Sequence, residues 1–173
     1  MEFINILIII AFVIFALLEG KSAIKAILEQ RKLIKKLQED KHELIIIKDY
    51  MKETIVYAIL AGLILAYCFV YYSQQQYLFA GVFAIMPLFC IIFILEATVN
   101  RTIVFYESGF LYATQLVRYK SVLKIDDKKK FIRGYHVVLI NDDDRVYVTK
   151  KGKEVLENQL KEFKERKKHK HEK

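Results

Sequence analysis

The chain has 173 residues, of which 54% are hydrophobic and 28% charged, with a formal net charge of +8. This composition is incompatible with an even distribution over one soluble domain and favours a chain that separates apolar spans from charged segments. One Pro and six Gly exclude a low-complexity disordered chain, except at the extreme C-terminus. Cys68 and Cys90 lie in apolar stretches without Cys or His at ligand spacing, which argues against a disulfide framework or a zinc site.

The N-terminal apolar segment is interpreted as a first membrane span over residues 3–20. Asn5 is the only polar residue up to Leu18, and extension to Gly20 brings the length near the roughly 20 residues that a ~30 Å hydrocarbon core requires. No basic residue precedes this segment, and no small-residue cleavage site follows it. These features favour an uncleaved span over a signal peptide.

Two further apolar segments predict spans over residues 55–72 and 77–96. Neither has a charged residue in its interior, and the first ends in a Tyr pair that is typical of a membrane interface. The intervening residues 73–76 suffice only for a tight turn, so we expect an antiparallel helical hairpin. Pro87 lies in the middle of the second segment, where a kink is expected. The three spans define a membrane domain over residues 1–99.

The Lys and Arg residues all lie on one side of this topology. The loop 19–54 carries nine of them and the chain after Glu96 the other nineteen, whereas residues 73–76 carry none. By the positive-inside rule, this distribution predicts a multi-pass cell membrane protein with its N-terminus outside and its C-terminus in the cytoplasm. The spans lack internal ionisable groups, which argues against a stand-alone transporter or pump.

The cytoplasmic loop over residues 21–54 is predicted to form a long helical hairpin, because it contains no Gly or Pro and is rich in helix formers. Four apolar residues keep a heptad-like spacing typical of a coiled coil: Ile27, Ile34, Leu37 and Leu44. Gln30 and Lys41 interrupt this spacing. We expect the first span to continue as a helix to about Leu37 and the chain to return as a helix from about His42. The apolar stripe fits a self-packed stalk, an amphipathic helix on the membrane surface, or a docking surface for a partner's helix.

From residue 100 the apolar pattern changes, which predicts a small β domain over residues 100–165 and a basic tail over residues 166–173. Strands are expected at 102–106, 110–115, 134–140 and 145–149, with a strand or bend near 119–122. Turns are expected at 107–109, 126–130 and 141–144. A closing helix is expected at 153–167, with Val155, Leu156, Leu160 and Phe163 on one face. The expected fold class is therefore membrane α plus small β.

The order of these elements resembles the pleckstrin-homology-like (PH-like) tails of small bacterial membrane proteins. The resemblance is carried by the Glu107–Phe110 strand end, by Tyr119-x-Ser121-x-Leu123-x-Ile125, and by the late hairpin and terminal helix. The layout of three spans and such a tail is similar to an uncharacterised family of three-span bacterial membrane proteins. The long helical loop departs from that family. The resemblance implies a fold, and it implies no activity for particular residues.

No residue pattern predicts an active site. There is no G-x-S-x-G elbow and no glycine-rich phosphate loop. His136 is expected to be a solvent-facing strand residue, and the run Asp142–Asp144 to be a polar turn, since it lacks the EF-hand ligand pattern. We therefore expect a protein that is not an enzyme and has no cofactor or metal site.

Two basic clusters are candidate contacts for anionic lipid on the cytoplasmic side. They comprise Lys128, Lys129 and Lys130 and, near the C-terminus, Arg166, Lys167, Lys168 and Lys170. Each such residue contributes ~1 kcal/mol of attraction to an anionic membrane surface. A membrane-tethered domain meets lipid before nucleic acid, so lipid is the favoured polyanion. Solvated charge without a ligand is the simplest interpretation of both clusters.

Three classes of function remain. The first is a non-enzymatic membrane protein that acts through its cytoplasmic domain by protein–protein or inner-leaflet contact, such as an accessory, regulatory or immunity protein of a larger membrane complex. The second is an oligomeric transport or channel component. The third is an enzyme, which requires a pocket with converging ionisable groups. We favour the first, with the bilayer and either a membrane protein or a second copy of the chain as partners.

Overall fold

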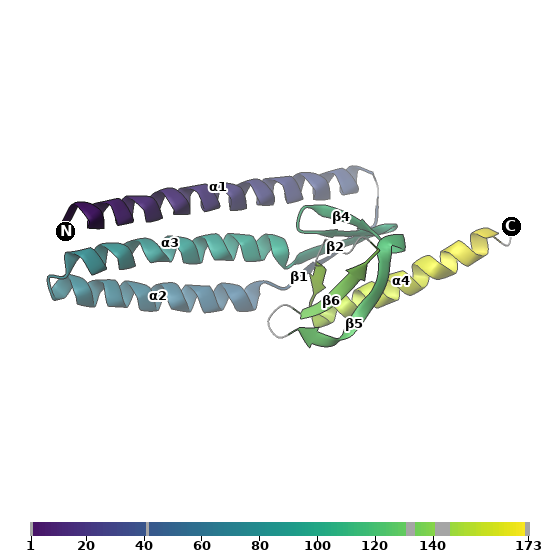
Figure 1. Cartoon of the computed structure of the whole chain (residues 1–173). Helices are drawn as coiled ribbons and strands as arrows, with labels where there is room; N and C mark the ends of the chain where they lie inside the picture. Colours follow the sequence, from purple (N-terminus) through teal and green to yellow (C-terminus); the bar gives the residue numbers. More distant parts are fainter. Residues whose placement is uncertain (1, 41, 131–133, 141–145, 172–173) are drawn as a thin grey trace. The chain divides into compact units, whose positions relative to one another are not determined.

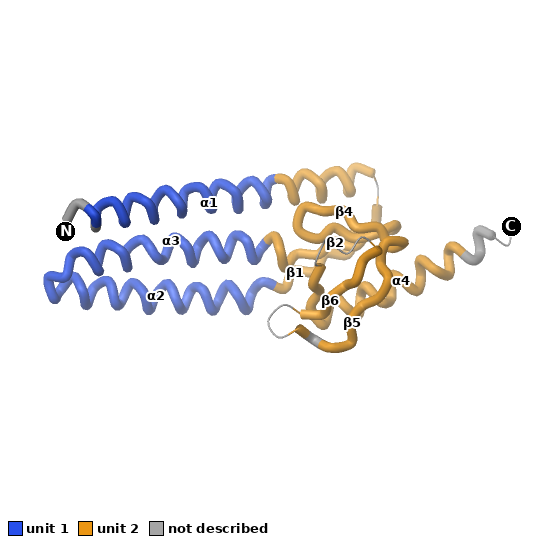
Figure 2. The backbone as a smooth tube through the Cα atoms, in the orientation of Figure 1, with its two compact units in different colours: residues 1–28, 50–98 blue, residues 29–49, 99–173 orange. Residues whose placement is uncertain are grey.

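The chain divides into two compact units in the computed structural model, and each unit contains segments that are far apart in the sequence. Unit 1 comprises Met1–Leu28 and Tyr50–Thr98, and unit 2 comprises Glu29–Asp49 and Val99–Lys173 (Figure 2). The described residues are 2–40, 42–130, 134–140 and 146–171.

Unit 1 is formed by helices that are long and apolar enough to cross a membrane. They are α1 (Glu2–Glu39), α2 (Met51–Ser73) and α3 (Tyr77–Asn100) (Figure 1). The chain therefore has the character of a multi-pass membrane protein, and the three predicted spans are confirmed as helices. Both α1 and α3 extend beyond unit 1 and contribute their last residues to unit 2.

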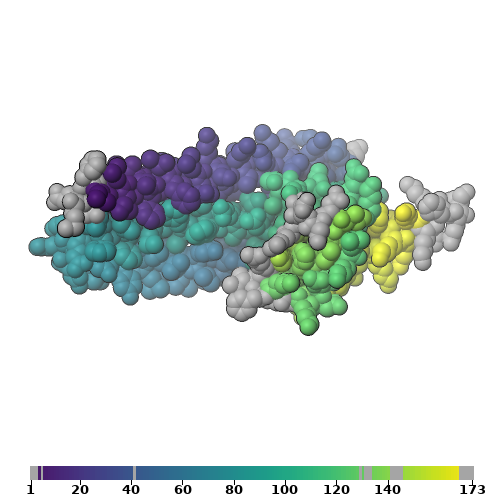
Figure 3. Space-filling model, in the orientation of Figure 1, coloured from purple at the N-terminus to yellow at the C-terminus, as the bar shows by residue number. Residues whose placement is uncertain are grey.

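Within unit 1, α3 packs against both other helices. Phe89 of α3 contacts Phe12 and Phe15 of α1, with ring centroids 6.2 and 5.9 Å apart. Tyr71 of α2 stacks on Phe83 of α3 at 5.2 Å. Most other apolar side chains of these helices are exposed and form the surface of unit 1 (Figure 3), as expected for helices that hydrocarbon surrounds.

The connection between α2 and α3 is the predicted tight turn. Gln75 adopts a positive φ of 59°, and the amide of Gln76 donates to the carbonyl of Tyr71 at 3.0 Å. The pairing of Tyr71 with residues of α3 confirms the antiparallel hairpin of the second and third spans. α3 passes through Pro87 as one continuous helix.

The predicted helical hairpin of the loop is wrong in its returning half. α1 continues to Glu39, as expected, but the chain then forms a short strand, β1 (Ile45–Lys48), which pairs antiparallel with β2 (Thr102–Tyr106). Three consecutive β-branched Ile residues favour an extended backbone, and β2 offers a free edge for their hydrogen bonds. The loop therefore belongs partly to unit 2, and the domain boundary predicted at residue 100 is incomplete.

Sheet A of unit 2 has the strand order β1-β2-β3-β4, with all neighbours antiparallel. β3 covers Gly109–Tyr112 and β4 covers Gln115–Arg118. The single strand expected over 110–115 is thus interrupted by a turn, where Ala113 has a φ of 51°. The short 3₁₀ helix η1 (Tyr119–Ser121) then leads out of the sheet, at the position of the predicted strand or bend.

Sheet B has the order β5-β6-β7, formed by Val122–Lys130, Gly134–Leu139 and Val146–Val148. The turn predicted at 126–130 is wrong, because β5 continues to Lys130. Its register against β6 shifts between Ile125 and Lys129, so an irregularity in the ladder accommodates the charged run. The turn predicted at 141–144 lies outside the described residues.

Helix α4 (Lys150–His171) follows β7 and closes unit 2. Leu156 is fully buried in the core with Phe105, Phe110 and Val137, and Val155, Leu160 and Phe163 pack against it. These four residues of α4 were predicted to share a face. The helix is longer than the predicted 153–167 at both ends, and the segment expected to be a tail from residue 166 is helical up to His171.

Candidate functional site

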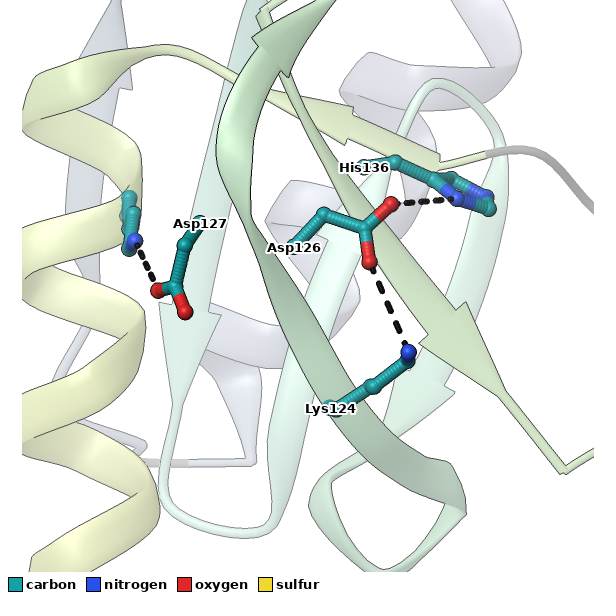
Figure 4. A network of polar contacts seen from close by, with 5 residues as sticks. Lys124, Asp126, Asp127 and His136 are labelled. Carbon is teal, nitrogen blue, oxygen red and sulfur yellow. Dashed lines mark hydrogen bonds and ion pairs between the residues drawn. The ribbon is translucent and has the colours of Figure 1, made fainter.

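A network of polar side chains lies on sheet B (Figure 4). Asp126 of β5 pairs with His136 of β6, with 3.5 Å between Oδ2 and Nδ1, and Lys124 approaches the other carboxylate oxygen at 3.8 Å. The His136 ring also packs on Tyr147 of β7, with centroids 5.3 Å apart. The side chain is 19% exposed. His136 is therefore a partly exposed strand residue whose side chain contacts Asp126 and Tyr147.

This network holds an imidazole beside a carboxylate, and its known partners are residues of the same sheet. An Asp–His pair supports catalysis when a nucleophile or a metal completes it. Within the part of the chain that the structure describes, no group of three or more His, Cys, Asp or Glu side chains is placed to hold a metal ion. The observed contacts join β5, β6 and β7, and they favour a structural role.

The first turns of α4 are fastened to β5 by Lys153. Its Nζ lies 3.2 Å from Asp127 and 3.6 Å from Glu157, and 4.8 Å above the ring centroid of Tyr135. The hydroxyl of Thr149 accepts a hydrogen bond from the Gly152 amide at 3.3 Å and so caps the helix. These contacts place the beginning of α4 beside the last residues of β5.

Four exposed lysines lie at the end of β5 and the start of α4, and we refer to them as the lysine cluster: Lys128, Lys130, Lys150 and Lys151. Strand register places the two pairs at the same end of sheet B, because Lys130 opposes Gly134 on β6 and Tyr135 of β6 opposes Val148, the last residue of β7. None of the four forms an ion pair with a described residue. The side chain of Lys129, the third member of the predicted cluster, lies outside the described part of the chain.

The second predicted basic cluster lies elsewhere on unit 2. Arg166 pairs with Glu107 at the β2–β3 turn, at 3.5 Å between Nη1 and Oε1, and its Nη2 donates to the Glu107 carbonyl at 3.4 Å. About 20 Å of helix separates Arg166 from Lys153, at 1.5 Å per residue. Lys167 is exposed, whereas the side chains of Lys168 and Lys170 lie outside the described residues. The structure thus does not join the two predicted clusters into one surface.

A polar groove of about 320 Å³ lies beside Arg166, between the β2–β3 turn and α4. His42 contributes Nδ1 at 4.0 Å from Glu107, and its ring lies 5.8 Å from that of Tyr106. Nearby Tyr119 is 2% exposed, and its hydroxyl has no hydrogen-bond partner among the described residues. Burial raises the pKa of the Tyr119 phenol well above its ordinary range.

A groove of about 550 Å³ with mixed polar and apolar lining lies between β4, η1 and the end of β6. It is lined in part by Leu116 and Ile140, which are 48% and 59% exposed, and the neighbouring Leu123 is 62% exposed. β4 is also the end strand of sheet A. Exposed apolar side chains beside a sheet edge are typical of a contact surface.

Sequence reasoning missed the contribution of Lys150 and Lys151 to a basic surface. The predicted helix began at residue 153, so these residues lay in an unassigned stretch. The two consecutive lysines directly before Gly152 were the available signal, but their closeness to Lys128 follows only from the pairing of β5, β6 and β7.

Comparisons of this chain with protein-family models, with curated proteins and with solved structures found no match.

Proposed function

We propose that this protein is a non-enzymatic, multi-pass protein of the cell membrane that acts by contact through a cytoplasmic unit 2. The N-terminus lies outside and the C-terminus inside. The contact is with a membrane-protein partner or the inner leaflet, and the role is that of an accessory, regulatory or immunity protein of a larger membrane complex. The positive-inside distribution of all 28 Lys and Arg residues supports the orientation.

The observation that carries this proposal is the way in which unit 2 is built onto the membrane helices. α1 and α3 run without interruption into unit 2, and only Asp49 and Tyr50 separate β1 from α2. Three short covalent connections replace the single flexible linker of a tethered domain. A domain connected so closely to three membrane helices is suited to presenting a surface at the bilayer.

Unit 2 is proposed to be a PH-like domain. Two small antiparallel sheets followed by one closing helix support this proposal. β1 departs from this pattern. It comes from the loop between the first two spans and precedes α2 and α3 in the chain. Folding of the domain therefore requires the loop and the C-terminal segment together.

The chemistry of unit 2 also fits contact better than catalysis. Two polar contacts on its surface are ion pairs between elements of the fold, Arg166 with Glu107 and Asp126 with His136. Exposed apolar side chains such as Leu116 and Ile140 lie on or beside the edge strand β4, where an extended segment of a partner has a free sheet edge to join. The β4 edge is thus the place to test contact.

Site-specific photo-crosslinking in intact cells tests the proposal. A photoreactive amino acid replaces Leu116 or Ile140 in the full chain at native expression level, with Glu154 and Lys161 on the exposed face of α4 as matched control positions. We expect a discrete protein adduct, either a partner or a second copy, from Leu116 and Ile140 and none from the controls. Equal diffuse labelling at all four positions would overturn the contact proposal at this edge.

A flux assay separates this function from transport. Full-length protein in liposomes is expected to leave ion and small-solute permeability unchanged. A specific flux would replace the contact function by the oligomeric transport component that the sequence also allows.

A further inference from the structure

We infer that the lysine cluster binds the anionic phospholipid headgroups of the leaflet at which the membrane helices of this chain end. This inference rests on the proposed function, because it requires unit 2 to lie on the cytoplasmic side. It assigns lipid contact to Lys128, Lys130, Lys150 and Lys151, and it removes the assignment from the basic residues at the end of α4.

The lysine cluster lies beside the positive end of a helix. The first turn of α4 contains Lys150, Lys151 and Lys153 and no acidic residue. The amino end of a helix already carries about half a positive charge, so cations there are unfavourable unless anions lie near. Asp127 and Glu157 neutralise Lys153, but the four residues of the lysine cluster have no anionic partner among the described residues. An anionic headgroup supplies the missing charge.

The lysine cluster lies at the end of unit 2 that α3 enters. The chain passes from α3 into β2 with only Arg101 between them, so Ile103 lies at the end of unit 2 that the membrane helix joins. Gly152 packs at this end, since a Cβ at its position would lie 3.4 Å from Cδ1 of Ile103. Lys150 and Lys151 directly precede Gly152. The lysine cluster and the junction with α3 thus share one end of unit 2.

The distance along the chain is short enough for headgroup contact. From the predicted end of the third span at Glu96, the chain is helical to Asn100 and then extended to Ile103, and it covers about 16 Å at most. The headgroup region adds about 5–8 Å to each side of the hydrocarbon core, and an anionic surface acts over a further Debye length of about 8 Å. Lysines at this end of unit 2 therefore fall within reach of the surface potential.

The basic residues near the end of α4 lie at the opposite end of unit 2. Glu107 lies beyond the opposite end of β2, and Arg166 pairs with it there. α4 consequently runs from the end of unit 2 that adjoins α3 to the remote end. Arg166 and Lys167 are carried away from the junction and face solvent, and Arg166 already has an anionic partner.

The experiment measures the approach of α4 to headgroups in the full chain. Cys68 and Cys90 are replaced by Ala, and a fluorophore is attached at Glu154→Cys, one turn beyond the lysines. The protein is reconstituted in nanodiscs that carry a nitroxide-labelled headgroup lipid, in phosphatidylcholine alone or with about 30% phosphatidylglycerol. We expect stronger quenching in the anionic discs, and we expect high salt to remove the difference.

Two charge-matched variants decide which cluster is responsible. The variant K128Q/K130Q/K150Q/K151Q is expected to lose the difference between the two lipids, because each lysine shifts the ratio of docked to undocked unit 2 by about fivefold. The control K161Q/K164Q/R166Q/K167Q removes the same charge from the remote end and is expected to retain the difference. All substitutions are at exposed positions, and the single variants Lys150→Gln and Lys151→Gln give a graded response if the quadruple variant misfolds.

The inference is overturned if quenching is the same in both lipids, or if only the remote-end variant loses the difference. If either result is found but crosslinking at Leu116 persists, the proposed function still holds and only the lipid contact is lost. Labelling of Glu157→Cys by a membrane-impermeant reagent on intact cells would instead place unit 2 outside, and it would remove the proposed function and the lipid contact together.

Discussion

At the scale of single residues, the buried polar group of α1 is the most informative. Gln30 is 6% exposed, and its Nε2 donates to the carbonyl oxygens of Val99 and Ala113, each at 3.0 Å. The buried residues of α1 lie seven apart: Ala16, Ala23, Gln30 and Leu37. Gln30 therefore occupies the buried seam of the helix, whereas the heptad-like spacing of the sequence identified it as an interruption.

Replacement of Gln30 by Leu is expected to lower the free energy of unfolding by about 1–3 kcal/mol, because two buried carbonyl groups lose their donor. The exposed Gln38→Leu serves as the matched control on the same helix and is expected to change it by less than about 0.5 kcal/mol. Denaturant unfolding of the full chain in micelles, followed by near-ultraviolet circular dichroism, measures both. Equal stability of the two variants would show that these hydrogen bonds contribute nothing.

Tyr119→Phe is expected to raise stability at neutral pH by about 1 kcal/mol, because it removes a buried hydroxyl without a partner among the described residues. Burial raises the pKa of Tyr119 in the folded state above that of the unfolded chain. Above about pH 10 the unfolded state loses a proton that the folded state keeps, so stability falls as pH rises. Melting curves at about pH 9 and about pH 11 lie on either side of the tyrosine pKa of the unfolded chain. Between these two pH values, Tyr119→Phe should lose less stability than the wild type.

At the scale of secondary-structure elements, β1 decides how unit 2 is assembled. Its central contact is Ile47, which is 5% exposed and pairs with Ile103, while the adjacent Ile46 is 42% exposed. Ile47→Ala is expected to lower stability by about 2–4 kcal/mol, and Ile46→Ala by less than about 1 kcal/mol. Hydrogen exchange over residues 45–48 provides an independent test. If a helix replaced β1, the two substitutions would lower stability by similar amounts.

Gly134 permits the return from β5 into β6. It has a φ of +99°, and a Cβ at its position would collide with the carbonyl oxygen of Val148 on β7. Gly134→Ala is expected to lower stability by at least about 2 kcal/mol. Gly62 of α2, where a Cβ meets nothing within 4 Å, provides the control, and Gly62→Ala is expected to be neutral or stabilising. Comparable losses in both variants would contradict the register of β6 against β7.

At the scale of the whole molecule, the testable property is the side of the membrane on which each segment lies. A thiol at Gln75, in the turn between α2 and α3, is expected to react with an impermeant maleimide on intact cells. A thiol at Glu157 of α4 should react only after permeabilisation. The opposite pattern would invert the topology, and reaction of both would show that the helices do not span.

The three membrane helices and most strands could be predicted from the sequence because their signals are local. An uninterrupted apolar stretch of about 20 residues has one stable form in hydrocarbon, and the β-branched and aromatic residues around Val104 and Val137 indicate a strand without a distant partner. The helix of residues 153–167 was likewise predicted from its period. The ends of elements could be predicted less well. In β5, the charged run up to Lys130 has the composition of a turn, and it is a strand because it pairs with β6.

The sequence by itself determined that this chain has three apolar spans and one highly charged remainder, because hydrophobicity and charge are additive properties of a segment. Only the tertiary structure decided that Ile45–Lys48 is a strand, since its hydrogen bonds are made to Thr102–Tyr106 across two intervening helices. The tertiary structure also decided which lysines share one end of sheet B. Lys128 and Lys151 lie at the same end because three antiparallel strands fold one onto the next, and a linear pattern carries no record of that pairing.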